Sequence, residues 1–274
     1  MEVMTEIATP PESLVAIVRV IDLETTGNSF TDGGVVEIGW QDVVADADGW
    51  RLSGPPGACL VRPGNPISPA TSAIHHIVDE DVADAPSWHA VAPGVLCSAP
   101  PPIVLAAHRA SFEQRWCLPA LSGHAQWICT YKCALRLWPE APGHSNQGLR
   151  YWRRPQGLDR TLGMPAHRAG PDAYVTAHHL RDMLALTGVA QLLAWSAEPA
   201  LLARVPYGAS RGRRWADIDE AALLRILEGD DGGNVDLLFT ARTERDRRCG
   251  LPPTLPTPGQ LSLGLAAGTD RNHR

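Results

Sequence analysis

The chain has 274 residues, of which 44% are hydrophobic, and a formal net charge of −6 at pH 7. No apolar run reaches the ~18 residues of a membrane-spanning helix, and the negative charge argues against a chain coated with basic side chains. Glu2 and Glu6 stand where a signal peptide would carry basic residues, so we expect a cytoplasmic protein. Its six cysteines form no C-x-x-C pair, which favours free thiols over a zinc site.

The first regular element follows a polar segment, residues 1–13, which we expect to be a loose leader. The apolar, β-branched run Val15 to Ile21 predicts a buried central strand that ends at Asp22 and Glu24, before the turn residues Thr25 to Gly27. Side chains alternate along a strand, so the two carboxylates point to one face. Side by side they repel each other and lose hydration, and a divalent cation with a preference for oxygen ligands would remove both penalties.

Two further strands and two helices are expected next. Val35 to Val44 and Cys59 to Arg62 predict strands, and the turn signal from Asp46 to Gly49 between them indicates an antiparallel meander with the first strand. Helices are predicted over Pro69 to Asp81 and over Pro86 to Leu96.

A second strand–helix unit follows a run of three prolines. Ile103 to Ala107 predicts a short strand that leads directly into the polar segment His108 to Glu113. The carboxyl edge of such a strand is where open α/β sheets bind ligands. Trp127 to Thr130 predicts another strand, and Lys132 to Trp138 a helix.

Two helix starts come next. Residues 144–147, HSNQ, stand at the N-cap position of a helix through Leu149 to Trp152. His167 precedes Asp172 by five residues at the start of a long amphipathic helix that ends near Leu186.

A small module is expected over residues 204–249, followed by a disordered tail over 250–274. The stretch VPYGASRGRRW predicts two short strands around a turn, and helices are predicted over Ala221 to Leu227 and Leu237 to Arg247. The arginines of that turn have two interpretations, either a grip on a phosphate backbone or a solvated hairpin tip.

The acids and one histidine suggest a common chemistry. Phosphodiester hydrolysis by two cations, roughly 3.5–4 Å apart, needs carboxylates to hold them and a base to deprotonate water. A histidine, with an unperturbed pKa near 6.5, suits the base role. The candidates, in chain order, are Asp22, Glu24, Glu113, His167 and Asp172.

Three motifs then indicate a family. DLETTG, HRASFEQRW and HRAGPD resemble the exonuclease motifs of the RNase H-like 3′–5′ exonucleases of the DEDD class that have a histidine in the third motif. GGVVEI, VRPGNPISPATSAIHHI, WICTYKCALRLWP, HSNQGLRY and VPYGASRGRRW resemble further blocks of the exodeoxyribonuclease X-like members, so the likeness covers residues 15–249. It implies an α/β fold, with an RNase H-like mixed sheet flanked by helices in a domain over 14–195, and a small C-terminal α+β module.

The resemblance also implies roles for single residues. Asp22 would bridge two Mg²⁺ ions, for which Mn²⁺ would substitute, and Glu24 and Asp172 would hold the ion that positions the attacking water. Glu113 would hold the second ion through water, and His167 would be the general base. The residues expected to contact substrate are Thr25, Thr26, Phe30, His108, Phe112, Ser145 and Asn146. The whole HSNQ segment, residues 144–147, would line the substrate groove.

The resemblance implies a metal-dependent 3′–5′ exodeoxyribonuclease that acts on single-stranded DNA or DNA 3′ ends, in DNA repair. Two alternatives stay open: an exoribonuclease that trims RNA, and a catalytically weakened nucleic-acid-binding module. The second is suggested by two departures from the family pattern, because Arg109 and Glu113 stand where the family has Asn and Asp.

Overall fold

The computed structural model describes residues 16–251, apart from 29–30, 32 and 230–233. The chain divides into two compact units, residues 1–199 and 200–274, which are described separately here. The leader expected over residues 1–13, nearly all of the tail expected over 250–274, and the expected substrate contact Phe30 lie outside the described residues.

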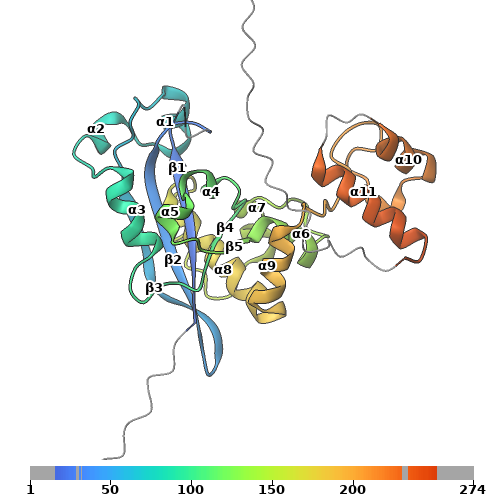
Figure 1. Ribbon diagram of the computed structural model, residues 1–274, viewed down its shortest axis with the longest axis horizontal. Coiled ribbons are helices and arrows are strands. Elements are labelled where there is room, and N and C mark those ends of the chain that lie inside the picture. Colours follow the sequence, from blue (N-terminus) through green and yellow to red (C-terminus); the bar gives the residue numbers. More distant parts are fainter. Residues whose placement is uncertain (1–15, 29–30, 32, 230–233, 252–274) are drawn as a thin grey trace, which may run out of the picture. The chain divides into compact units, whose positions relative to one another are not determined.

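A five-stranded mixed sheet forms the centre of the first unit, as the sequence predicted (Figure 1). Its strands are β1 (Ile17–Thr25), β2 (Val35–Asp46), β3 (Gly49–Leu60), β4 (Val104–Ala107) and β5 (Trp127–Cys129). They lie in the order β3-β2-β1-β4-β5. The first three pair antiparallel, whereas β4 pairs parallel with both β1 and β5.

Helices pack against both faces of this sheet. Because side chains alternate along β1, its odd and even positions pack against different helices. Val18 and Val20 belong to a hydrophobic cluster with α6, α8 and α9, whereas Ile21 and Leu23 pack with α3 on the opposite face. Figure 1 shows α8 and α9 on one side of the strands and α3 on the other. The helix bounds are α1 Pro69–His75, α2 Asp79–Val82, α3 Trp88–Leu96, α4 Glu113–Trp116, α5 Pro119–Ser122, α6 Thr130–Leu137, α7 Asn146–Arg153, α8 Ala169–Thr187 and α9 Val189–Ala197.

Several bounds differ from the prediction. Strand β1 continues through the two carboxylates to Thr25, and β3 begins at Gly49 rather than at Cys59. Prolines 55 and 56 do not end β3 because it is an edge strand, and the register shifts opposite them, between Trp40 and Asp42. The helix predicted over Pro69 to Asp81 is split into α1 and α2, because His76 adopts a left-handed φ of 59° and ends α1.

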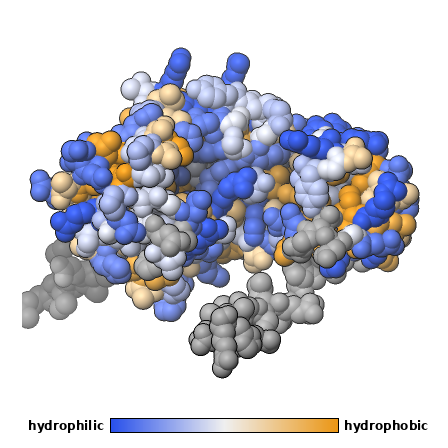
Figure 2. Space-filling view, turned by 90° about the horizontal axis from the view of Figure 1, so that it is seen from above, coloured by the Kyte–Doolittle hydropathy of each residue, from blue (hydrophilic) through white to orange (hydrophobic). Residues whose placement is uncertain are grey.

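The second unit is built from η1 (Trp215–Asp217), α10 (Glu220–Glu228) and α11 (Val235–Arg248) around a small core of its own. The two short strands expected near residues 205–215 are reduced to a single bridge between Arg204 and Arg214. The intervening chain forms turns, with positive φ at Gly208 and Gly212. The surface visible in Figure 2 shows hydrophobic residues in separate patches among hydrophilic ones.

Two further expectations concern the whole of the described chain. All six cysteines are free thiols; the expectation that they are buried holds for Cys117, Cys129 and Cys133, whereas Cys97 and Cys249 are exposed. Within the described ranges, no helix combines the length and the apolar character needed to cross a membrane.

Candidate active site

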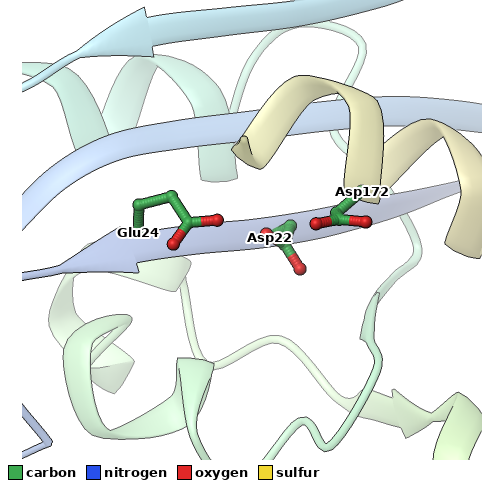
Figure 3. Close-up of side chains that lie close together, drawn as sticks. All are labelled: Asp22, Glu24 and Asp172. Carbon is green, nitrogen blue, oxygen red and sulfur yellow. The ribbon is translucent and has the colours of Figure 1, made fainter. Parts of the chain in front are cut away.

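The centre of the site is a cluster of three carboxylates on the α8 face of the sheet. Asp22 and Glu24 alternate with buried apolar residues along β1, and Asp172 lies in the first turn of α8 (Figure 3). One carboxylate oxygen from each residue lies within 4.8 Å of the others. The three residues therefore offer a compact set of hard oxygen ligands, which suits a divalent cation.

A glycine permits this close approach of α8 to the sheet. Gly39 of β2 pairs with Asp22 across the ladder. A Cβ atom at Gly39 would lie 2.0 Å from the backbone carbon of Ala169, the first residue of α8. Because the neighbouring atoms are backbone, no side-chain rotation relieves that clash, and only glycine lets Asp172 come this close to Asp22.

The Asp172 carboxylate is held by hydrogen bonds from two sides. The Gln147 side chain donates to its Oδ1 at 2.6 Å, and Asn146 donates to the same oxygen at 3.3 Å. The backbone amide of His167 donates to Oδ2 at 2.7 Å. Ser145 caps α7 through its hydroxyl, which accepts from the Gly148 amide, so it fixes the start of the helix that carries these amide side chains.

A buried ion pair fixes the turn that carries His167. Glu37 of β2 is 3% exposed and pairs across the sheet with Glu24. Its carboxylate accepts from Arg168 at 2.9 and 2.6 Å and from the amide of Ala169 at 2.8 Å. His167 itself has a left-handed φ of 60°, and its side chain is exposed.

Glu113 adds a fourth carboxylate to the acidic set from α4. It is the first residue of α4 and is 3% exposed, and its Oε2 has no hydrogen-bond partner within the described part of the chain. Burial raises the pKa of Glu113 to about 8, with a smaller contribution from the charge of Glu24. A buried carboxylate oxygen without a partner is costly, and a cation ligated directly or through water would offset that cost.

The two carboxylates of β1 resist ionisation without a cation. Burial, followed by the charges of Asp172 and Glu24, raises the pKa of Asp22 well above its ordinary value. Burial and the charge of Asp172 raise the pKa of Glu24 to about 8. The donor chemistry, the shared location and the unpartnered oxygen all fit bound divalent cations.

These groups open into one cleft of about 600 Å³. It is lined by Asp22, Leu23, Glu24, His108, Arg109, Phe112, Glu113, Ser145, Asn146, Gln147, His167 and Asp172. The five residues predicted to be catalytic thus come together, with four of the residues expected to contact substrate.

The remaining expected contacts have other partners in the described structure. Thr25 donates to the carbonyl of Gly27 at 2.7 Å, and the Thr26 hydroxyl accepts from the Gly34 amide at 2.9 Å. Both hydroxyls thus shape the turn after β1, and neither residue lines the cleft.

His108 lines the cleft but is bonded at both ring nitrogens. Nδ1 lies 3.0 Å from the hydroxyl of Thr130, and Nε2 lies 2.8 Å from the carbonyl oxygen of His144. Burial lowers the pKa of His108 to about 4, so the ring is neutral and anchors the end of β4.

Sequence reasoning missed two residues that hold the site, because Glu37 with Arg168 clamps the loop before α8. Gln147 was expected to line the substrate groove as part of HSNQ, but its direct bond to Asp172 was not predicted. A charged residue within the apolar run VVEIG was the available signal for Glu37. For Arg168 the only signal was its position beside His167.

Comparisons with known proteins agree with this site. A family model described as "Exonuclease" matches residues 19–180, and the chain belongs to this exonuclease family. By family and by the order of its motifs, the enzyme is a 3′–5′ exonuclease, a hydrolase of phosphodiester bonds. Members of the family depend on divalent metal, in agreement with the carboxylate cluster.

Individual relatives cover most of the chain. Exodeoxyribonuclease 10 of Escherichia coli (strain K12) is 38% identical over 206 residues, which are 74% of this chain and 86% of that protein. The protein of the same name from Escherichia coli O6:H1 gives the same values. A solved structure, exonuclease X in complex with 5′ overhanging duplex DNA, is 36% identical with a TM-score of 0.55, and the match covers 66% of this chain and 99% of that one.

Proposed function

We propose that the enzyme removes nucleotides from DNA 3′ ends, with two Mg²⁺ ions as its natural cofactor and Mn²⁺ as a substitute. The observation that carries this proposal is the cluster of Asp22, Glu24 and Asp172 in one cleft with the buried Glu113. The choice of DNA rests on the curated relatives, which are named as exodeoxyribonucleases, and on the solved relative in complex with duplex DNA.

In this mechanism Asp22, Glu24 and Asp172 would hold one cation, and Asp22 with Glu113 would hold the second. Such cations supply charge neutralisation at the phosphate and favour deprotonation of water. The exposed imidazole of His167 takes the proton from the attacking water. Its backbone bond to Asp172 fixes the position of the main chain that carries that imidazole beside the carboxylates. The bond from phosphorus to the 3′ oxygen breaks, and a nucleoside 5′-monophosphate leaves.

The decisive assay uses 3′-labelled single-stranded DNA, duplex DNA and RNA of one sequence, each with Mg²⁺ and with EDTA. We expect Mg²⁺-dependent release of mononucleotides from DNA. Faster release from RNA would favour the exoribonuclease alternative. Binding without cleavage of any substrate in Mg²⁺ or Mn²⁺ would favour the weakened binding module.

Two variants separate the roles within the site. His167→Ala should lower turnover by about 10²–10⁴-fold while leaving DNA affinity in Ca²⁺ nearly unchanged, because the proposed role of His167 is proton transfer.

Asp22→Asn should abolish the rise in melting temperature that Mg²⁺ or Mn²⁺ gives the wild type, because a ligand specific to the native state stabilises it. An unchanged rise in that variant would contradict a shared metal site. The role in DNA repair and the cytoplasmic location stay predictions.

A further inference from the structure

Arg109 occupies an unusual place in the cleft. It is the second residue after β4 and has a left-handed φ of 73°, a conformation uncommon for a residue with a long side chain. The residue before it, His108, is fixed by hydrogen bonds at both ring nitrogens. The backbone of Arg109 therefore starts from a rigid anchor at the carboxyl edge of the sheet.

The guanidinium group of Arg109 is also held in place. Its central carbon lies 4.0 Å from the centre of the Tyr131 ring, in a cation–π contact. Tyr131 belongs to the first turn of α6, and its ring meets the His108 ring edge-on at 5.9 Å. A guanidinium held over a ring by a cation–π contact does not use its N–H groups for that contact, so they can donate to an anion.

The charge of Arg109 has no acidic partner among the described residues, although four carboxylates line the same cleft. Several other arginines of the first unit do have an acidic partner, as Arg19 with Asp42 and Arg168 with Glu37 show. Arg109 is exposed, so its charge is available to a molecule that enters the cleft.

We propose that Arg109 binds a phosphate of the substrate strand next to the phosphate that is cleaved. This inference rests on the proposed function and assigns one of its substrate contacts. Two N–H groups of a guanidinium match two oxygens of a phosphodiester, and the Tyr131 platform orients that fork before substrate arrives. The positive charge also lowers the repulsion between the acidic cleft and a polyanionic strand.

The test compares two substrates in the full-length enzyme with Mg²⁺. One is a single-stranded oligonucleotide, and the other is thymidine 5′-(4-nitrophenyl phosphate), which has no second phosphate. For Arg109→Gln we expect KM for the oligonucleotide to rise about 10- to 100-fold, the cost of one charged hydrogen-bonded contact, with kcat changed much less. The small ester should be hydrolysed with unchanged kcat/KM. Arg109→Lys should recover part of the loss, because it keeps the charge without the fork.

A control variant and a modified substrate make the result specific. Arg62→Gln removes an equally exposed arginine that does not line the cleft, and it should behave as the wild type. Single methylphosphonate linkages, which are neutral, are placed at successive positions from the 3′ end. At one position the neutral linkage should weaken binding of the oligonucleotide to the wild type in Ca²⁺. At that same position it should leave the affinity of Arg109→Gln unchanged, because this variant has already lost the contact.

Each outcome bears on a different claim. An Arg109→Gln enzyme with wild-type KM for the oligonucleotide would overturn the inference, as would equal sensitivity of both enzymes to every methylphosphonate. A loss of kcat/KM on the small ester, in a variant with normal melting temperature, would also overturn it by assigning Arg109 to the cleavage step. A wild type that cleaves neither substrate would instead contradict the proposed function.

Discussion

At the scale of single residues, Glu113 is the acidic residue of the site that departs from the family pattern. Compared with the aspartate of the family pattern, it adds one methylene and moves the carboxylate by roughly 1.5 Å. A ligand at 2.0–2.1 Å from an octahedral Mg²⁺ would not absorb that shift, whereas one acting through water would. Glu113 lines the cleft, and its buried Oε2 has no hydrogen-bond partner among the described residues, which fits a role in metal binding.

We therefore predict that Glu113→Gln, which keeps the size and removes the charge, costs far more activity than Glu113→Asp. The measurement is kcat on single-stranded DNA with Mg²⁺ and with Mn²⁺. Glu113→Gln with wild-type activity would show that this carboxylate holds no metal. An inert wild type that Glu113→Asp reactivates would show that the extra methylene had disabled the site.

The sequence was informative about residues whose role depends on local pattern. The alternation of β1 was enough to place Asp22 and Glu24 on one face, and the structure brings the expected ligand Asp172 of α8 beside them. It was not informative about residues whose role depends on a distant partner. Glu37 and Arg168 are 131 positions apart, and no local pattern predicts their ion pair.

At the scale of elements, the contact between β2 and the start of α8 sets the geometry of the site. Gly39→Ala would place a Cβ against the backbone of Ala169 and force α8 away from β1. We expect a loss of stability of about 1–3 kcal/mol, as for other overpacked sites. The displacement of Asp172 should also reduce activity and the stabilisation by Mg²⁺.

The matched control is Gly94→Ala in α3, where an added Cβ meets nothing within 4 Å. Alanine favours a helix over glycine by about 1 kcal/mol, so this variant should be as stable as the wild type or more so. Melting curves with and without Mg²⁺ measure both effects. A Gly39→Ala enzyme with wild-type stability and the wild-type rise in melting temperature with Mg²⁺ would refute the close contact between β2 and the start of α8.

The sequence predicted the ends of an element well where the composition changes sharply. It predicted them poorly where contacts with distant parts of the chain determine where the element ends. The start of β4 after the prolines was placed within one residue, at Val104. The full length of β3 was missed because a proline pair reads as a break, although an edge strand tolerates it. The two strands expected near residues 205–215 were wrong in extent, since successive turns leave only one bridge.

At the scale of the whole molecule, a buried histidine should couple stability to pH. His178 of α8 is 3% exposed, neither ring nitrogen has a partner within the described residues, and its ring packs edge-on against Tyr174. Burial, then the charge of Arg181, lowers the pKa of His178 to about 4; Arg153 acts in the same direction and Asp182 opposes it. Between pH 6.5 and about 4 the unfolded chain therefore binds a proton that the folded protein does not.

Stability should fall as the pH drops through this window, by up to about 1.4 kcal/mol per pH unit for this one group. The His178→Leu variant should not show this pH-dependent loss of stability. Its free energy of unfolding should therefore rise relative to that of the wild type as the pH is lowered from 7.5 to 5. Urea unfolding at both pH values without metal measures it. A difference that does not change with pH would show that folding does not lower the pKa of His178.

The arginine turn of the second unit is the remaining hypothesis from the sequence. Arg211, Arg213 and Arg214 belong to a stretch, residues 200–216, that contains no acidic residue. None of the three is in an ion pair among the described residues, whereas Arg247 and Arg248 of α11 pair with Glu244. The charge of the turn arginines is therefore not neutralised by an ion pair, whereas much of the positive charge of α11 is.

If these three arginines bind phosphates, changing all of them to Gln should flatten the dependence of log affinity on log salt. The slope for single-stranded DNA should fall by roughly 0.7 for each lost contact, because fewer counterions are released on binding. Affinities are measured in Ca²⁺ over a range of salt concentrations. The control replaces Arg242, Arg245 and Arg247 of α11 by Gln, which removes the same charge from the same unit and should leave the slope nearly unchanged. Equal slopes for the turn variant and the wild type would show that the turn is a solvated loop, and equal flattening in both triple variants would show that only net charge matters.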